Sequence, residues 1–332
     1  MSTPTLDRTA PAAGRSSLRG PVRVLLRLHR KALWAAAGLL ILGIAFVVAL
    51  RLWMASEKAL CPDGDITPCG DGIYQASYAR TSAEVFLADG GTALLVLAAL
   101  VGLFVAGPLV ARELESGTFR LAWAQSVSPA RWLAARLAVP AALVVTGLAV
   151  LIVVYRWGLR ALRGFPYSFG PHWYDNGAFP GTGPAILGYG LLAVAVGALC
   201  ALLVRRTLLS MTLSALVLGT VAIGLGMRRY VLWPTSLRTG GAPVTYSSGD
   251  WLIESGMLTD SGRKLYWQDC YDAGLRDNAE ACMRSRGGVS HFGEYHPTSH
   301  YWPLQLVETG ILLALAALAV FAAFRVLRRL HG

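Results

Sequence analysis

The charged residues of the segment ARELESGTFRLAWAQSVSPARW, positions 111–132, are unusual because long apolar runs flank them on both sides. Glu113 and Glu115 are two carboxylates close together in sequence, and such a pair can act as general acid and general base. We expect no catalysis from them, because an exposed loop supplies neither the burial nor the opposed partner that separates two carboxyl pKa values. Exposed charge together with a glycine, Gly117, instead suits a surface that docks on another protein.

A second group of chemically capable side chains lies in HFGEYHPTSH, which contains His291, Glu294, His296 and His300. Imidazole and carboxylate groups bind metals, and His296 and His300 are four residues apart, a spacing that places two ligands on one face of a helix. The segment matches no metal motif, and Pro-Thr-Ser would have to form that helical turn. We therefore expect exposed loop histidines and no metal in this chain.

ATP chemistry is not expected of this chain either. A P-loop requires Gly-Lys-Ser/Thr, and none of the lysines, Lys31, Lys58 and Lys264, follows a glycine. The chain is thus not expected to be an enzyme.

The elements that carry these residues are predicted to cross a membrane. The chain has 332 residues, of which 55% are hydrophobic and 15% charged, and its mean hydropathy is +0.49. This is far more apolar than one soluble core requires. The first apolar run begins at residue 33 and lacks a cleavage site, so we do not interpret it as a signal peptide. We predict an all-α membrane protein with six spans, each long enough for a hydrocarbon core of about 30 Å, at 33–52, 91–111, 137–157, 183–204, 208–227 and 303–324.

The distribution of basic residues predicts the orientation of these spans. The net charge is +11, but the basic residues cluster at the ends of apolar runs and form no nucleic-acid module, so no nucleic-acid partner is expected. One side holds sixteen Lys and Arg against three acids. We expect this side, with both termini, to be the cytoplasmic side of the plasma membrane. The other side also contains basic residues, contrary to the rule that Lys and Arg are enriched on the cytoplasmic side: Arg156, Arg160 and Arg163.

Cysteine positions agree with this orientation. Cys61 and Cys69 lie in the first predicted outer loop, and Cys270 and Cys282 lie in the last, on the oxidising side. Proximity in sequence predicts two local disulfides; free thiols are the alternative. Cys200, inside the fourth span, is expected to be a small packing residue.

The chain divides into five regions by composition. The tail is rich in Ser, Pro, Ala and Arg and is expected to be disordered. The following segment places Arg23, Arg27 and Arg30 on one stripe, which indicates either a helix lying at the membrane surface or an ordinary basic flank. The regions are a disordered cytoplasmic tail, 1–20; an interfacial helix, 21–32; spans one to five with a cytoplasmic loop at 112–136, 33–227; an extracellular loop domain, 228–302; and span six with the C-terminus, 303–332.

The loop at 112–136 is predicted to form a rigid elbow. Good helix formers flank Gly117, and Ser128 followed by Pro129 is a helix start signal, because the serine oxygen can accept first-turn N–H groups and proline has no N–H to lose. The third helix should therefore begin at Pro129, before the lipid. Within the spans, charges are few and Glu308 is the main exception, so energy for any transport would come from elsewhere.

This elbow resembles the corresponding loop of the permease subunits of ABC-2 type ATP-binding-cassette exporters. The resemblance rests on Glu113-x-Glu115-x-Gly117-Thr118, Gln125-Ser126-Val127-Ser128 and Arg131-Trp132. In that family the loop holds a coupling helix that inserts into a groove of a separate ATPase subunit, which binds ATP and Mg²⁺. The resemblance implies such a partner and a dimer with a second copy or a sister permease. The docking residues it implies are Glu113, Glu115, Gly117, Thr118, Arg120, Ser128, Arg131 and Trp132.

The favoured function is therefore an exporter permease that moves an amphiphilic or hydrophobic substrate outward. A large apolar cavity without intramembrane charge suits such cargo. Two alternatives remain open from the sequence. One is a membrane enzyme that uses the outer histidines, and the other is a ligand-sensing or immunity membrane protein that does not transport.

Overall fold

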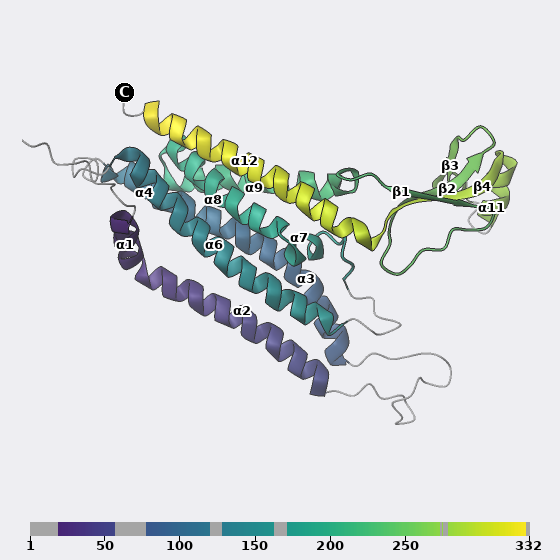
Figure 1. Ribbon diagram of the computed structural model, residues 1–332, viewed down its shortest axis with the longest axis horizontal. Helices are drawn as coiled ribbons and strands as arrows, with labels where there is room; N and C mark the ends of the chain where they lie inside the picture. Colours follow the sequence, from purple (N-terminus) through teal and green to yellow (C-terminus); the bar gives the residue numbers. More distant parts are fainter. Residues whose placement is uncertain are drawn as a thin grey trace, which may run out of the picture.

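A bundle of long helices carries a small β-sheet at one end in the computed structural model of the chain (Figure 1). The structure describes residues 19–56, 78–119, 128–162, 171–272, 274 and 278–329. Six helical segments within these ranges are long and apolar enough to cross a membrane, by length and composition. The expectation of six spans is confirmed. The segments are Arg30–Ser56, Tyr78–Ser116, Pro129–Arg160, Ala185–Val204, Thr207–Val231 and Thr298–Arg329.

The second span is longer than the sequence predicted. It runs continuously through α3 (Tyr78–Val101), a π-helical turn (Gly102–Ala106) and α4 (Gly107–Ser116). The hydropathy pattern did not indicate this extension, because the first turns of α3 contain charged residues. Arg80 and Glu84 are four residues apart and form an ion pair at 4.0 Å, which is compatible with a helix.

The third span, α6 (Pro129–Arg160), begins at the predicted proline. Ser128 precedes it in an extended conformation, with φ −64° and ψ 142°. The serine side chain makes no capping hydrogen bond within the described part of the chain. The boundary is thus confirmed, whereas the expected hydroxyl cap is not seen; proline and the extended backbone define the start.

The centre of the bundle is α8 (Ala185–Val204), which is the most buried of the six spans. It packs against α3, α4, α6, α9 (Thr207–Arg228) and α12 (Tyr301–Arg329). Glycines permit the closest approach: a Cβ on Gly102 would lie 2.4 Å from the Ala193 carbonyl oxygen, and one on Gly197 would lie 2.5 Å from that of Gly102. Cys200 is buried in this core, as expected of a packing residue.

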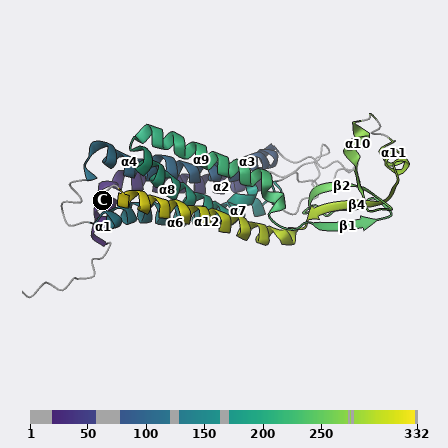
Figure 2. The ribbon, with the colours of Figure 1, turned by 90° about the horizontal axis from the view of Figure 1, so that it is seen from above.

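A short helix precedes the first span. It is α1 (Arg19–Leu28), and a turn at His29 separates it from α2 (Arg30–Ser56). Figures 1 and 2 place α1 and the last turns of α12 at the same end of the bundle, opposite the sheet. The helix covers most of the predicted 21–32 segment, and Arg23, Arg27 and Arg30 are exposed. Residues 1–18 of the predicted disordered tail, 1–20, lie outside the described residues, and its last two residues, Arg19 and Gly20, begin α1.

The region between the fifth and sixth spans is a sheet domain, residues 236–296, and not only a loop. Its four antiparallel strands have the order β1-β4-β2-β3. The expectation of an all-α fold therefore does not hold for this domain. The strands were not recognised from the sequence, because their exposed and buried residues do not alternate strictly. Its elements are β1 (Ser236–Gly240), β2 (Trp251–Thr259), β3 (Lys264–Tyr266), α10 (Trp267–Tyr271), α11 (Ala279–Ser285) and β4 (Gly288–His296).

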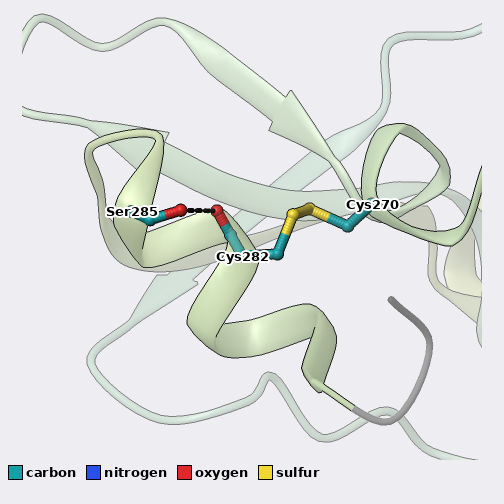
Figure 3. The surroundings of a disulfide bond; sticks show 3 residues. All are labelled: Cys270, Cys282 and Ser285. Carbon is teal, nitrogen blue, oxygen red and sulfur yellow. Dashed lines mark hydrogen bonds between the residues drawn. A yellow bond between two sulfur atoms is a disulfide. The ribbon is translucent and has the colours of Figure 1, made fainter. Parts of the chain in front are cut away.

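A disulfide closes the far end of the sheet domain. Cys270 of α10 and Cys282 of α11 are bonded, which confirms one predicted pair (Figure 3). Ser285 Oγ donates to the Cys282 carbonyl at 2.8 Å, which fixes the end of α11. The predicted pair Cys61 and Cys69 lies outside the described residues.

Candidate functional site

The described parts of the elbow, residues 112–119 and 128–136, lie at the bundle end opposite the sheet domain, and the first glutamate of the elbow binds the neighbouring helix. Trp132 Nε1 donates to Glu113 Oε2 at 2.9 Å, and Arg136 Nη2 donates to Glu113 Oε1. The Arg136 guanidinium also lies over the Trp132 ring, 4.2 Å from its centroid. We call these three residues the brace. It joins the end of α4 to the start of α6.

The brace should be strong for its position near the protein surface. Glu113 is 27% exposed and Arg136 is 11% exposed, so the pair is only partly hydrated. Charge-assisted hydrogen bonds are worth roughly 1.5–3 kcal/mol each. Trp132 is 2% exposed and belongs to the main core. The indole therefore positions Glu113 and presents no free surface of its own.

The second glutamate of the elbow binds a third helix. Glu115 Oε2 accepts hydrogen bonds from the Thr207 backbone N–H at 3.2 Å and from Thr207 Oγ1 at 2.7 Å. Thr207 is the first residue of α9, where unpaired N–H groups and the helix dipole favour a carboxylate. The end of α4 is thus held to α6 through Glu113 and to α9 through Glu115.

Other predicted docking residues are exposed around the brace. Gly117 ends α4 in the left-handed region, with φ 73°, which favours glycine. Thr118 Oγ1 lies 2.9 Å from Ser116 Oγ. Arg120 lies outside the described residues. The predicted docking residues with exposed side chains are Glu115, Thr118, Ser128 and Arg131, and Arg112 beside them, which was not among the predicted docking residues, is also exposed.

The opposite end of the bundle holds a buried ion pair. Arg229 Nε donates to Glu308 Oε2 at 2.8 Å, and Tyr189 OH donates to Glu308 Oε1 at 2.9 Å. Arg229 is 2% exposed and Glu308 is fully buried. The Arg229 guanidinium also lies 4.2 Å from the centre of the Phe179 ring. Arg229 was not singled out from the sequence, since it follows an apolar run as ordinary basic flanks do.

The histidines of HFGEYHPTSH do not form one cluster. His296 ends β4 and lies against His300, with their Nδ1 atoms 3.0 Å apart, while its Nε2 donates to the Tyr230 carbonyl at 2.9 Å. His291 stacks on Trp267. The expectation of exposed loop histidines is wrong for His291 and His296, because both belong to β4 and are buried. No group of three or more His, Cys, Asp or Glu within the described ranges could hold a metal ion.

Glu294 belongs to a separate charged group on the sheet. Lys264 Nζ donates to Glu294 at 2.5 Å and to Glu254 at 3.2 Å, which joins three strands. These hydrogen bonds, the one to Glu294 first, raise the pKa of Lys264 above its ordinary value. The group has the features of a structural cross-strand ion pair.

Six apolar helices define the class of the chain: it is a multi-pass helical membrane protein. A family model described as ABC-2 membrane transporter related matches residues 33–229, which is more than half of the chain. The chain belongs to that family of ABC-2 type permeases. Such permeases are membrane subunits that normally work with an ATPase subunit. No curated protein and no solved structure matches the chain significantly.

The family match covers the elbow and the first five spans. It ends at Arg229, so the sheet domain and α12 lie outside it.

Proposed function

We propose that the chain is the membrane subunit of an ATP-driven exporter, and that residues 112–136 dock on a separate ATP-binding-cassette ATPase. That partner binds and hydrolyses ATP with Mg²⁺. Two permease halves, either two copies of this chain or this chain and a sister permease, enclose the transport route. Both termini and the elbow face the cytoplasm at the plasma membrane.

The observation that carries this proposal is the attachment of the elbow to two helices at once. Glu113 binds α6 through Trp132 and Arg136, and Glu115 binds the first turn of α9. A force applied to the elbow therefore reaches two spans directly. An ordinary polar loop needs no such double attachment.

The docking residues divide into two roles under this proposal. Arg112, Thr118, Ser128 and Arg131 are exposed and contact the ATPase. Glu113, Glu115 and Trp132 are positioning residues, because their polar atoms are already bonded within the chain. Gly117 supplies the left-handed turn that separates α4 from the rest of the elbow.

The transported substrate is an amphiphilic or hydrophobic molecule that moves outward. The large apolar side chains exposed on α9 include Leu208 and Leu216. Surfaces of this kind, brought together between two permease halves, form a route without charge. When the ATPases close, the elbows move α6 and α9 and change the side to which this route opens.

Co-purification and coupled activity test the two roles separately. The chain is extracted from its native membrane into nanodiscs, and co-purifying ATPases are identified by mass spectrometry. Arg131→Glu should lower the amount of bound ABC ATPase at least tenfold without changing Tm, since this residue only contacts the partner. Arg328→Glu, the same charge change at an exposed position of the same bundle end, is the matched control and should leave binding intact.

Glu113→Gln tests the brace. This variant keeps the side-chain shape but weakens both bonds to α6, so the ATPase should still bind while its ATP hydrolysis no longer responds to the permease. If wild-type protein carries no ABC ATPase under conditions that preserve a known exporter complex, the proposed function is wrong.

A further inference from the structure

A groove of about 450 Å³ lies between the first, second and third spans, in the half of the bundle nearest α1. Its walls come from α1 and α2, from the α3–π–α4 span, and from α6. His29 is the only polar residue in its described lining. The volume is in the range of small-molecule sites, roughly 300–1,000 Å³.

The groove exists because α2 approaches α6 closely at only one end. In the half near the sheet domain, a Cβ on Gly158 would lie 2.8 Å from Val47 Cγ1, so the two helices are in contact there. Toward α1 the facing positions carry small residues, Ala32 and Ala36 on α2 and Gly147 on α6. A Cβ on Gly147 would meet no described atom within 4 Å. The space between the helices is therefore not filled by side chains.

The depth of the groove matches one leaflet of a bilayer. Its wall follows α6 from Val139 to Leu151, about 18 Å at 1.5 Å per residue. Half of a hydrocarbon core of about 30 Å is about 15 Å. An acyl chain of one leaflet thus fits the length of the groove, with its polar end toward α1.

The end of the groove near α1 is strongly basic. Leu26 and His29 line the groove, and their sequence neighbours Arg27 and Arg30 are exposed. His29 Nδ1 donates to the Leu25 carbonyl at 3.1 Å, so this ring is held in place at the groove's end. Basic side chains at this depth attract anionic headgroups.

We propose that this groove is a specific site for an anionic phospholipid of the leaflet on the α1 side, with an acyl chain between α2 and α6 and the phosphate bound by Arg27 and Arg30. The site is distinct from any route between two permease halves, and it does not depend on the proposed export function. A second copy of the chain is a poorer occupant, because a symmetric contact would bring its own basic α1 toward this one.

Photo-crosslinking in nanodiscs tests the proposal with the full-length chain. The nanodiscs contain phosphatidylcholine and a small fraction of a photoactivatable probe, either phosphatidylglycerol or phosphatidylcholine, and the labelled peptides are mapped by mass spectrometry. Phosphatidylglycerol should label the peptides of α1, α2 and α6 that line the groove at least fivefold more than phosphatidylcholine does. A fivefold ratio corresponds to the binding free energy that about one basic residue contributes near an anionic membrane surface.

Two sets of variants distinguish a built site from ordinary surrounding lipid. Gly147→Trp fills the groove and should lower its labelling at least fivefold. Gly310→Trp on α12 is the matched control, because a Cβ there also meets no described atom within 4 Å, and it should leave labelling unchanged. The double variant Arg27→Gln, Arg30→Gln should remove the preference for phosphatidylglycerol and retain the fold, since both side chains are exposed.

Three results would overturn the proposal. They are equal labelling by the two lipids, labelling that Gly147→Trp leaves unchanged, and a disulfide between two copies carrying Leu39→Cys, which would mean that a second copy covers the groove.

Discussion

Glu308 is a buried carboxylate at the end of the bundle near the sheet domain. Its carboxylate accepts hydrogen bonds from Arg229 on one side and Tyr189 on the other, and all three side chains are buried. Arg229 Nη1 has no hydrogen-bond partner among the described residues, so this guanidinium already lacks one bond. Removing the Glu308 carboxylate would leave the buried positive charge of Arg229 unpaired.

Glu308→Gln should therefore destabilise the protein by about 3–5 kcal/mol. The loss is measured as a fall in Tm in detergent or nanodiscs. The double variant Arg229→Met, Glu308→Gln should be more stable than Glu308→Gln alone, because no unpaired charge remains. Glu280→Gln is the control: it breaks an exposed pair with Arg284 and should change Tm little. A Tm for Glu308→Gln equal to wild type would contradict this interpretation.

At the scale of elements, α9 is attached at both ends. Its first residue, Thr207, binds Glu115 of α4, and the turn after its last residue holds Arg229 and Tyr230. The Tyr230 carbonyl accepts from His296, the last residue of β4. This arrangement links the elbow, the fifth span and the sheet domain by bonded side chains.

Aromatic packing reinforces the junction between the sheet domain and the bundle. Trp173 Nε1 donates to the Gly249 carbonyl at 2.6 Å, and its ring meets those of Trp251 and Tyr301 edge to face. These rings come from the α6–α7 connection, from β2 and from α12. The sheet domain is therefore packed against two separate parts of the membrane bundle.

The junction should loosen in acid because of His296. Burial lowers the pKa of its imidazole below the usual value. The Tyr230 carbonyl requires a proton on Nε2, so neutral His296 accepts at Nδ1 from His300. The unfolded chain takes up a proton near pH 6.5 that the folded imidazole resists. The contribution of neutral His296 is thus complete above about pH 6.5 and decreases as the pH falls below it.

Hydrogen exchange measures this effect. Exchange in β4 and in the following turn should rise between pH 7 and pH 5, after correction for the intrinsic pH dependence of exchange. His296→Gln keeps a donor for Tyr230 but cannot titrate in this range, so its exchange should not change with pH. The same acid response in this variant would assign the effect to another group.

At the scale of the whole molecule, the two ends of the bundle differ in chemistry. One end carries exposed arginines of α1, the elbow and the end of α12. The other carries the sheet domain with the Cys270–Cys282 disulfide, which requires an oxidising compartment to persist. Both features agree with an N-terminal end inside the cell and a sheet domain outside it.

Cysteine labelling of intact cells tests this orientation. Ser261→Cys, at an exposed turn of the sheet domain, should react with a membrane-impermeant maleimide. Thr118→Cys, exposed at the other end, should react only after permeabilisation. Wild-type protein gives the background from the native cysteines. The reverse pattern would invert the topology and would contradict docking of a cytoplasmic ATPase on the elbow.

Several features of the fold could be predicted because they depend on local sequence. Span length follows from the length of an apolar run, the start of α6 follows from Pro129, and Cys270 and Cys282 were paired by proximity. The sheet was missed because exposed and buried residues do not alternate regularly along its two long strands, β2 and β4. The first turns of α3 were missed because Arg80 and Glu84 look polar until they are seen paired with each other.

The sequence by itself determined that this is a six-span membrane protein with a polar elbow between its second and third spans, because hydropathy and helix start signals are properties of neighbouring residues. Only the tertiary structure decided what the elbow's glutamates bind. Thr207 is 92 positions from Glu115, and Arg229 is 79 from Glu308. Such pairs form when packed helices bring distant segments together, and no local pattern encodes which residues will meet.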